Sequence, residues 1–141
     1  MLDEWIAQRI EVETRKTDLQ GADLSNYKLI AADLSDGNFS GADFTGAYLI
    51  RANLSGADLS GANLTHAVIS EANLSGATFS GADLSDAYLC GADLSHAVNL
   101  TCDQIELARI DRDTKLPGNI KIAWVSNDAY ECEEHAGKNS R

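Results

Sequence analysis

The chain has little of several features that define common protein classes. It has a single proline and a single methionine, and aromatic residues make up only 6% of its 141 positions. It contains no apolar run of the roughly 18 residues that a membrane-spanning helix needs. Its first residues, Met1 to Glu4, are acidic where a secretory signal would be positively charged. We therefore expect no membrane partner.

Basic residues are also scarce. The 11 Lys and Arg stand against 22 Asp and Glu, which gives a net charge of −11. Such a charge opposes binding to DNA, RNA or an anionic lipid surface. No direct nucleic-acid binding is expected, and cationic partners are favoured.

Only three cysteines are present, Cys90, Cys102 and Cys132, and no two of them form a C-x-x-C pair. An odd number at wide spacing favours free thiols in a reducing compartment, so we expect a cytoplasmic protein. N-glycosylation sequons would favour a secretory route, but they arise from the repeat described below. These sequons begin at Asn38, Asn53, Asn63, Asn73 and Asn99.

What the sequence does contain is one five-residue unit, repeated sixteen times between Thr17 and His96. A large apolar residue stands at every fifth position from Leu19 to Leu94, and a small residue, mostly Ala, lies two positions before it. These two positions share one face of an extended segment, while the polar residue between them faces the other way. The last two positions, mostly Ser then Gly, are typical of a tight turn. Each unit is therefore predicted to be a very short strand followed by a corner.

A second period, of twenty residues, indicates how many corners make one turn of the chain. The position before the central apolar residue is Asp or Asn in most units, but not in every fourth unit. Four units therefore complete one turn of a square coil, sixteen units make four coils, and one wall differs from the other three. On that wall the position is occupied by Lys28, Tyr48, Val68 and Tyr88.

The motif A-(D/N)-L-x-x, as in ADLSG at 57–61 and ANLSG at 72–76, resembles that of the pentapeptide repeat family. The resemblance covers 80 of the 141 residues and implies an all-β solenoid, a right-handed quadrilateral β-helix. The central apolar side chains are expected to fill its interior and to leave no cavity for a ligand. Some members of this family are DNA mimics that bind DNA gyrase and protect it from quinolones.

Residues 1–16 are expected to form an N-terminal cap and lead-in to the array at 17–96. Residues 2–11 have the spacing of a short amphipathic helix. Residues 12–16 fit the five-residue frame only loosely, as a degraded first repeat or a lead-in. The apolar face of the helix is predicted to consist of Leu2, Trp5, Ile6 and Ile10.

Residues 97–141 are expected to form a capping helix, an extended arm and a polar tail. The frame shifts by one residue after the array, and Thr101 with Gln104 has the spacing of a capping box, which opens a helix running to about Arg109. The run 99–117 also resembles the C-terminal closure of many bacterial members of the family. Residues 119–125 alternate as a strand or arm would, and residues 136–141 are expected to be disordered. The cap would hide the unpaired backbone of the last coil.

No catalytic, cofactor or metal site is predicted, so we expect a protein that is not an enzyme. His66 and His96 occupy turns on different walls and His135 lies in the tail, so no two histidines have the spacing of metal ligands or of an acid–base pair. The serines follow from the repeat, and no G-x-S-x-G motif is present. No basic residue lies near Cys90 in the sequence to activate it as a nucleophile.

The wall that departs from the repeat, called the odd wall, is the predicted binding site for an unidentified protein or for a second copy of the chain. Its outward positions are apolar or aromatic, and a contiguous apolar surface marks a binding site. The alternative is that the chain covers this wall itself, with the helix around Trp5 or with the arm at 119–125. The odd wall comprises Lys28, Ile30, Tyr48, Ile50, Arg51, Val68 and Tyr88, with Glu71 at its border.

The acidity of the array supports a second hypothesis. Ten acidic residues against Lys28 and Arg51 give residues 17–96 a charge of −8. Over a rod of about 19 Å this is roughly 0.4 charges per Å, compared with about 0.6 for duplex DNA. The position before the central apolar residue of each unit is called the slot. Asp and Asn alternate freely in the slot, which indicates that it serves local hydrogen bonding rather than a requirement for charge. The favoured function is a rigid scaffold for protein–protein interaction, and the alternative is a DNA mimic acting on gyrase or another topoisomerase.

Overall fold

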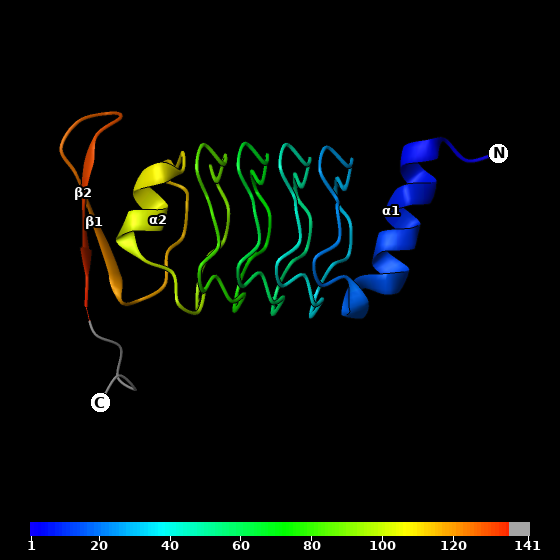
Figure 1. Cartoon of the computed structure of the whole chain (residues 1–141). Coiled ribbons are helices and arrows are strands. Elements are labelled where there is room, and N and C mark those ends of the chain that lie inside the picture. Colours follow the sequence, from blue (N-terminus) through cyan, green and yellow to red (C-terminus); the bar gives the residue numbers. More distant parts are fainter. Residues whose placement is uncertain (136–141) are drawn as a thin grey trace.

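A computed structural model, which describes residues 1–135, shows a rod-shaped solenoid with a helix at one end and a helix and hairpin at the other (Figure 1). Helix α1 spans Glu4–Arg15 and leads through a 3-10 turn, η1 (Lys16–Asp18), into the first coil. After the last coil come helix α2 (Cys102–Leu107) and an antiparallel hairpin of β1 (Ile120–Trp124) and β2 (Tyr130–Glu134). The disorder expected at 136–141 lies outside the described residues.

Successive coils lie side by side, joined by parallel β-bridges between residues twenty apart, beginning with Asp23 and Asp43. Backbone hydrogen bonds run from coil to coil, as from the Leu54 N–H to the Asn73 carbonyl at 2.7 Å. The twenty-residue period is therefore confirmed. Each unit after the first contributes a single bridged residue rather than the very short strand predicted, because a turn follows it at once, and the first unit begins within η1.

Every corner of the array is a hydrogen-bonded turn. In the unit at 57–61, for example, the Ala62 N–H donates to the Leu59 carbonyl at 3.0 Å. The residue before that N–H, Gly61, has a φ of 67°, which costs glycine nothing. Half of the turns place another residue there, among them Arg51 and Glu71 with φ values of 58° and 60°.

The side chains at the central positions fill the interior, as predicted. All of those from Leu19 to Leu94 are buried, and the rings of Phe39 and Phe44 pack edge to face with centroids 5.3 Å apart. Gly37 replaces the usual Ala because the Phe39 ring occupies the space that a Cβ would need. No polar or charged residue is buried in the described part of the chain, so the core is stabilised by apolar burial alone.

Helix α1 covers the first coil, but through a different side chain than predicted. Val12, assigned to a degraded repeat, is the buried residue of this helix, whereas Leu2 and Ile10 of the predicted face are exposed. The helix continues to Arg15 because residues 12–15 contain no Gly or Pro to end it. No helix within residues 1–135 is long and apolar enough to span a membrane.

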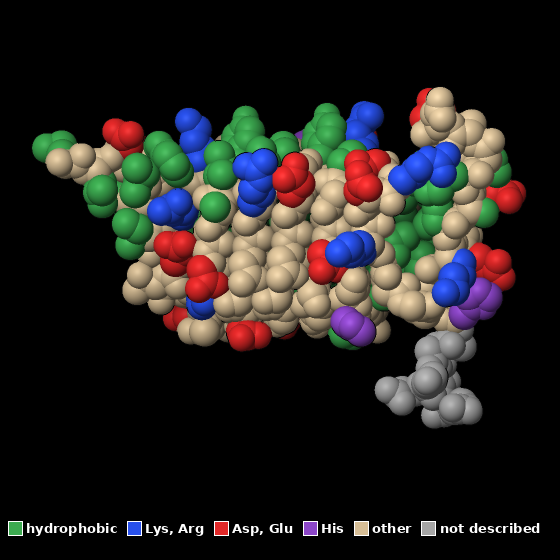
Figure 2. Space-filling view, turned by 180° about the vertical axis from the view of Figure 1, so that it is seen from behind, with side chains coloured by type: hydrophobic (Ala, Val, Ile, Leu, Met, Phe, Trp, Pro, Cys, Tyr) green, Lys and Arg blue, Asp and Glu red, His purple; other side chains and the backbone are tan. Residues whose placement is uncertain are grey.

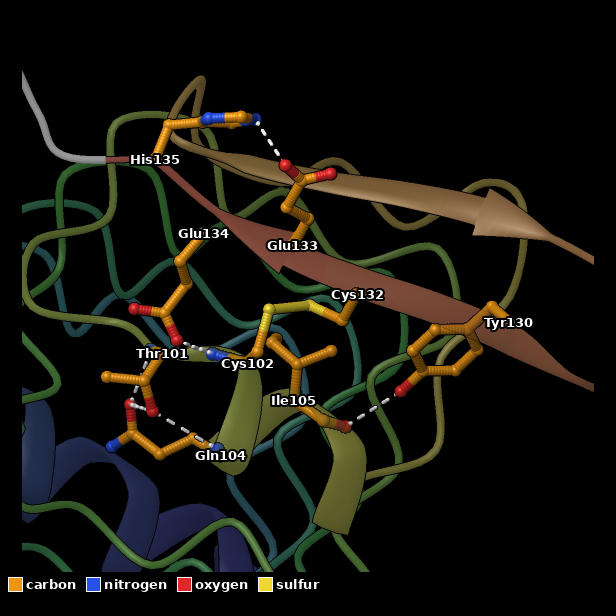
Figure 3. The surroundings of a disulfide bond; sticks show 9 residues. All are labelled: Thr101, Cys102, Gln104, Ile105, Tyr130, Cys132, Glu133, Glu134 and His135. Carbon is orange, nitrogen blue, oxygen red and sulfur yellow. Dashed lines mark hydrogen bonds and ion pairs between the residues drawn. A yellow bond between two sulfur atoms is a disulfide. The ribbon is translucent and has the colours of Figure 1, made fainter.

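Strand β2 lies in the stretch that the sequence indicated to be a polar tail. Its pairing with β1 folds the chain back over α2 and places Cys132 beside Cys102, with which it forms a disulfide (Figure 3). The expectation of three free thiols is therefore wrong, and only Cys90 is a free thiol in the structure. The cysteines thus no longer support the expectation of a reducing compartment.

Candidate functional site

Coil stacking brings the slot residues of the odd wall into one column. Parallel bridges join Lys28 to Tyr48, Tyr48 to Val68, and Val68 to Tyr88. A further bridge joins Tyr88 to Arg109, which was missed because it lies beyond the array. The one-residue shift of the frame after the array was the signal that could have found it.

The odd wall is open to solvent. Tyr48 and Tyr88 are 42% and 40% exposed, Ile30 is 37% exposed, and Val68 between the two tyrosines is half-buried. Figure 2 shows hydrophobic side chains along one edge of the rod, with Lys and Arg at both ends of this edge. The odd wall is therefore a strip of exposed apolar surface bounded by cations.

Neither end of the described chain covers this strip. Ile120, from the predicted arm, is buried at the C-terminal end of the rod, and the Trp124 ring packs edge to face against Tyr130 with centroids 5.2 Å apart. Helix α1 reaches only the N-terminal edge, where Arg9 donates to the Ile30 carbonyl at 3.4 Å. The alternative that the chain covers the odd wall with either segment is wrong for residues 1–135.

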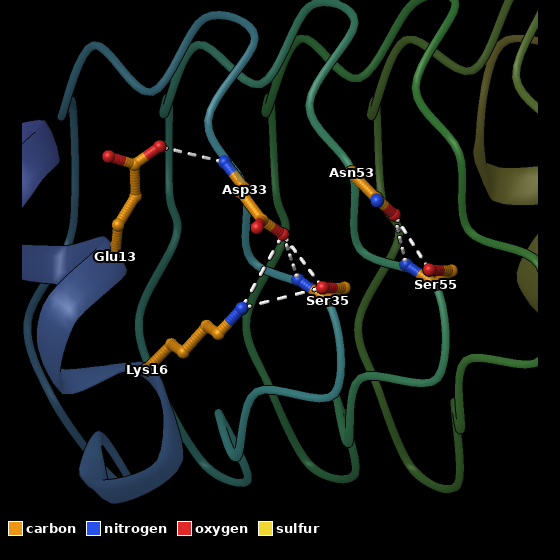
Figure 4. A network of polar contacts seen from close by, with 6 residues as sticks. All are labelled: Glu13, Lys16, Asp33, Ser35, Asn53 and Ser55. Atoms are coloured by element: carbon orange, nitrogen blue, oxygen red, sulfur yellow. Dashed lines mark hydrogen bonds and ion pairs between the residues drawn. The ribbon is translucent and has the colours of Figure 1, made fainter.

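On the other three walls, Asp and Asn side chains satisfy a backbone donor. The Oδ1 atom of each accepts a hydrogen bond from the backbone N–H two residues on, at 2.9 to 3.3 Å. Asp33 and Asn53 show that a carboxylate and an amide do the same job (Figure 4). The slot therefore serves local hydrogen bonding, as predicted. The residues that form this ladder are Asp23, Asp33, Asn38, Asp43, Asn53, Asp58, Asn63, Asn73, Asp83 and Asp93.

These hydrogen bonds lower the pKa of acids in the ladder. At Asp83 the Ser85 hydroxyl is the largest cause and the Ser85 backbone N–H is the second, while partial burial acts in the opposite direction. The same order of causes lowers the pKa of Asp23 and Asp93. The lowered pKa values show that the folded chain favours the ionised form of these side chains.

The odd wall lacks the ladder, and the corresponding backbone donors of its first three coils are unpaired. Its slot residues offer no carboxylate or amide oxygen, and no acceptor within residues 1–135 bonds the N–H groups of Ile30, Ile50 and Ser70, two residues after the first three slots. On the other walls an outward side chain reaches the equivalent N–H, so the group faces outward. The odd wall therefore presents a column of donors beside its apolar strip. These donors are the N–H groups of the first three coils, while the Cys90 N–H of the last coil has its own sulfur as an acceptor.

Cations lie at both ends and at the border of the odd wall. Lys28 begins the column, and Arg109 ends it with its guanidinium 5.4 Å from the centroid of the Tyr88 ring. Arg51 pairs with Glu71 at 3.0 Å on the border, and both side chains are exposed. Because Lys28 and Arg51 are the only basic residues of the sequence from 17 to 96, all the positive charge of the array is on this wall.

The remaining reactive side chains do not assemble into a site. His66 lies 3.9 Å from Asp86, and His135 lies 3.7 Å from Glu133, all at exposed positions. Within residues 1–135, no group of three or more His, Cys, Asp or Glu could hold a metal ion. Burial raises the pKa of the Cys90 thiol, and a neighbouring carboxylate adds to the shift, so this thiol is not activated.

A surface hollow of about 590 Å³ lies at the C-terminal end, between the loop after α2 and the hairpin. Two of its charged groups, Asp111 and Arg112, have partners within the chain. Asp111 accepts from the Gly91 N–H at 3.0 Å, and Arg112 donates to the Ser126 carbonyl at 3.2 Å and lies 4.8 Å from the centroid of the Trp124 ring. We assign the hollow to the packing of the cap and not to a ligand.

The sequence profile of the family described as Pentapeptide repeats matches this chain in eight copies, over residues 15–46, 28–65, 42–81 and 67–98. These segments cover more than half of the chain, which belongs to the pentapeptide repeat family. Membership confirms the right-handed β-helix solenoid that the resemblance implied. No curated protein matches the chain.

The chain is also similar to solved structures of this family. The pentapeptide repeat protein Rfr23 from the cyanobacterium Cyanothece 51142 is 19% identical over 79% of this chain and 99% of that one, with a TM-score of 0.32. The pentapeptide repeat protein alr5209 from Nostoc Pcc 7120 is 30% identical over 82% and 88%, with a TM-score of 0.28. QnrB1, a plasmid-mediated fluoroquinolone resistance protein, is 19% identical over 67% of this chain and 60% of that one, with a TM-score of 0.40. Because each TM-score is below 0.5, these structures carry no argument about function.

Proposed function

We propose that this chain is a non-enzymatic rigid scaffold that binds another protein through the odd wall. In this proposal the rod consists of four coils, and the caps formed by α1 and α2 keep its ends closed. Hydrogen bonds between the coils hold the backbone of the wall in place, so that little ordering is required when a partner binds.

One observation carries the proposal, namely the interruption of the ladder on the odd wall. On the other walls the outward slot stabilises the turn that follows it in ten of twelve units, whereas on the odd wall this local bond is absent in every coil. Exposed aromatic and apolar side chains, Tyr48 and Tyr88 among them, take its place. Binding of a partner explains why the wall lacks this side-chain hydrogen bond and exposes apolar surface instead. Aromatic residues are enriched at the centres of protein–protein interfaces.

The alternative, a DNA mimic acting on a topoisomerase, receives less support from the structure. Six of the ten acids of the array hydrogen-bond to their own turns, and Asn makes the same bond at Asn53 and Asn73. The positions of these six acids are therefore explained without a mimicry role. Inhibition of purified gyrase, or its protection from a quinolone, at micromolar protein would favour the alternative.

The test is the double variant Tyr48→Glu, Tyr88→Glu of the full chain. Both side chains are exposed, so the variant is expected to keep its fold while it loses the proteins captured from a lysate by the wild type. The matched control is Gln20→Glu, Ser80→Glu, which adds the same charge at exposed positions of the opposite wall. Capture by wild type and control but not by the wall variant supports the proposal. Equal capture by all three contradicts it.

A further inference from the structure

The unpaired donors of the odd wall indicate what a partner must supply. On three walls the chain places a carboxylate or amide oxygen 2.9 to 3.3 Å from the N–H two residues after the slot in ten of twelve units, the exceptions being the units of Asp18 and Thr78. On the odd wall the equivalent N–H groups of Ile30, Ile50 and Ser70 have no acceptor within residues 1–135. A partner that carries Asp or Glu side chains can provide this acceptor from outside, in charge-assisted hydrogen bonds.

The cations of the odd wall favour the same chemistry. Lys28 and Arg109 form no ion pair within residues 1–135, and they stand at opposite ends of the column. Four coil spacings separate them, which is about 19 Å at the usual distance between paired strands. Apolar side chains lie between them. The odd wall is therefore complementary to a segment that is apolar along one stripe and acidic beside it and at both ends.

The size of the odd wall indicates a short segment rather than a second copy of the chain. A wall about 19 Å long and about 10 Å wide offers roughly 200 Å², whereas stable dimers bury about 800 Å² on each partner. Any two-fold pairing that aligns the two columns from end to end would also bring Lys28 or Arg109 against a like charge. A homodimer through this wall is therefore disfavoured on both area and charge.

The backbone of the odd wall favours a helix over an added strand. The N–H groups of Tyr48, Val68 and Leu49 already bond to neighbouring coils at 2.7 to 2.9 Å, so the wall has no free sheet edge. A helix satisfies its own backbone and rises about 4.5 Å between residues i and i+3. This rise is close to the strand spacing of about 4.8 Å at which the unpaired donors recur.

We infer that the odd wall binds an acidic amphipathic helix of another protein, about 13 residues long to match the distance from Lys28 to Arg109. Its apolar stripe lies on Tyr48, Val68 and Tyr88. Its Asp and Glu side chains cap the column of unpaired N–H groups and pair with the two end cations. This inference rests on the proposed function of the odd wall and specifies the class of partner.

The charge of the whole chain, −11, opposes an acidic partner, so binding depends on the cations of the odd wall itself. The acids of the three ladder walls repel an acidic helix, while the odd wall carries Lys28, Arg51 and Arg109 against Glu71 and Asp111. At physiological salt, charges more than about 8 Å away are largely screened, so the wall's own cations act on a bound helix more strongly than the distant acids.

The probe is a displayed library of random 15-residue peptides, selected on the purified full chain and counter-selected on Tyr48→Glu, Tyr88→Glu. We expect the enriched peptides to carry a net negative charge and apolar residues at i, i+3, i+4 and i+7. A synthetic peptide from this set is then titrated against further variants. Lys28→Gln, Arg109→Gln is expected to bind it about 2- to 30-fold more weakly, the range for two exposed ion pairs.

A matched pair at Val68 tests the unpaired donors directly. Asn at this position supplies the acceptor that the other walls use and so occupies the Ser70 N–H, whereas Ala leaves that N–H free. We expect Val68→Asn to bind the peptide about tenfold more weakly than Val68→Ala, because one charge-assisted bond is lost. Both variants are expected to fold, since Asn already occupies this slot in other units.

The outcomes separate this inference from the proposed function. One outcome is that the selected peptides require Tyr48 and Tyr88 but are neutral or basic. Another is that they bind Val68→Asn and Val68→Ala equally. Either result overturns the acidic helix and leaves the odd wall as a binding surface. The absence of any wall-dependent peptide also overturns the helix, since the proposed function is tested with whole proteins from a lysate. Peptides bound equally by the Tyr48→Glu, Tyr88→Glu variant would count against both.

Discussion

One slot of the repeat has two roles in this protein. At Asp58 or Asn73 the side chain turns back to its own backbone and accepts the N–H two residues on. At Tyr48 and Tyr88 the same slot exposes an aromatic ring, and at Tyr48 it leaves that N–H unpaired. The chain tolerates the exchange because the slot faces outward, so the buried core does not depend on which residue occupies it.

The turn position offers a prediction on single residues. Arg51 and Glu71 hold φ values of 58° and 60°, a conformation that costs a non-glycine residue about 1 to 2 kcal/mol. Their exposed ion pair returns at most about 1 kcal/mol. Glu71→Gly should therefore raise the free energy of unfolding in urea by roughly 0.5 to 1 kcal/mol.

The control for this prediction is the reverse change at a turn of the same kind. Gly61→Ala places a Cβ at a φ of 67° without a close contact, so it should lower stability by about 1 kcal/mol. A destabilised Glu71→Gly would show that the ion pair outweighs the strain.

At the scale of elements, side chains from the two caps replace the coils that are missing at the ends. Glu13 of α1 accepts the Asp33 N–H at 2.8 Å, a group that in the next coil bonds to a carbonyl (Figure 4). At the other end, the Gln104 side chain donates to the carbonyls of Phe79 and Ala82 at 2.8 and 3.0 Å. The caps thus satisfy backbone groups that would otherwise recruit another chain.

The hairpin of β1 and β2 is held to α2 by three different contacts. The Cys102 N–H donates to the Glu134 carboxylate at 2.6 Å, the Tyr130 hydroxyl donates to the Ile105 carbonyl at 3.2 Å, and the disulfide joins Cys102 to Cys132 (Figure 3). The hairpin is therefore part of the cap and not a loose tail.

The disulfide leads to a prediction about the cap. Cys102→Ser, Cys132→Ser should lower the free energy of unfolding by about 2 to 4 kcal/mol, because the bond closes a long loop of the unfolded chain. Without reductant, one thiol per denatured chain should react with a thiol reagent, and three should react after reduction. Cys90→Ser is the control and should leave stability nearly unchanged. Three reactive thiols before reduction would contradict the disulfide.

At the scale of the whole molecule, the basic residues of the array lie on one wall, while Lys16 and Lys115, outside the array, lie at the two ends of the column that contains Asp33 and Asp93. Three walls carry the acids of the ladder, and the odd wall carries Lys28, Arg51 and Arg109. The positions of the ladder acids do not minimise repulsion between their charges, because each acid accepts a hydrogen bond from its own turn. These local hydrogen bonds thus stabilise an arrangement of acids that repulsion between their charges disfavours.

This arrangement predicts the response of the fold to acid. The pKa values of Asp23, Asp83 and Asp93 are lowered from 3.8 by hydrogen bonds that exist only in the folded chain. Because the folded pKa is the lower one, the contribution of these groups to stability is present above pH 3.8 and is lost as the pH falls through the folded values. The melting temperature should therefore be insensitive to these groups near neutral pH and should fall below about pH 4.

The chain offers a matched control for this acid dependence. Asp23→Asn, Asp83→Asn, Asp93→Asn keeps an Oδ1 acceptor in each slot, as at Asn53 and Asn73, but removes the titration. The triple variant should fold at neutral pH and lose less stability than the wild type in acid. The same loss in both proteins would show that other groups cause it.

Much of this fold could be predicted because the repeat makes every contact periodic. A residue that stands two positions from Leu54 in the sequence also stands near it in space, and the residue twenty positions on lies in the next coil. The odd wall could be predicted for the same reason. The position of Arg109 at the end of the column and the exposure of the wall could not be predicted, since both depend on where the non-repeating ends pack.

The sequence by itself determined the coil, its buried positions and the wall that departs from the rule, because these follow from spacing along the chain. Only the tertiary structure decided that Val12 packs on the first coil, that Cys102 pairs with Cys132, and that both ends leave the odd wall open. Contacts between segments without a common period depend on three-dimensional packing. The unpaired N–H groups of the odd wall likewise become visible only when the hydrogen bonds of the other walls are seen.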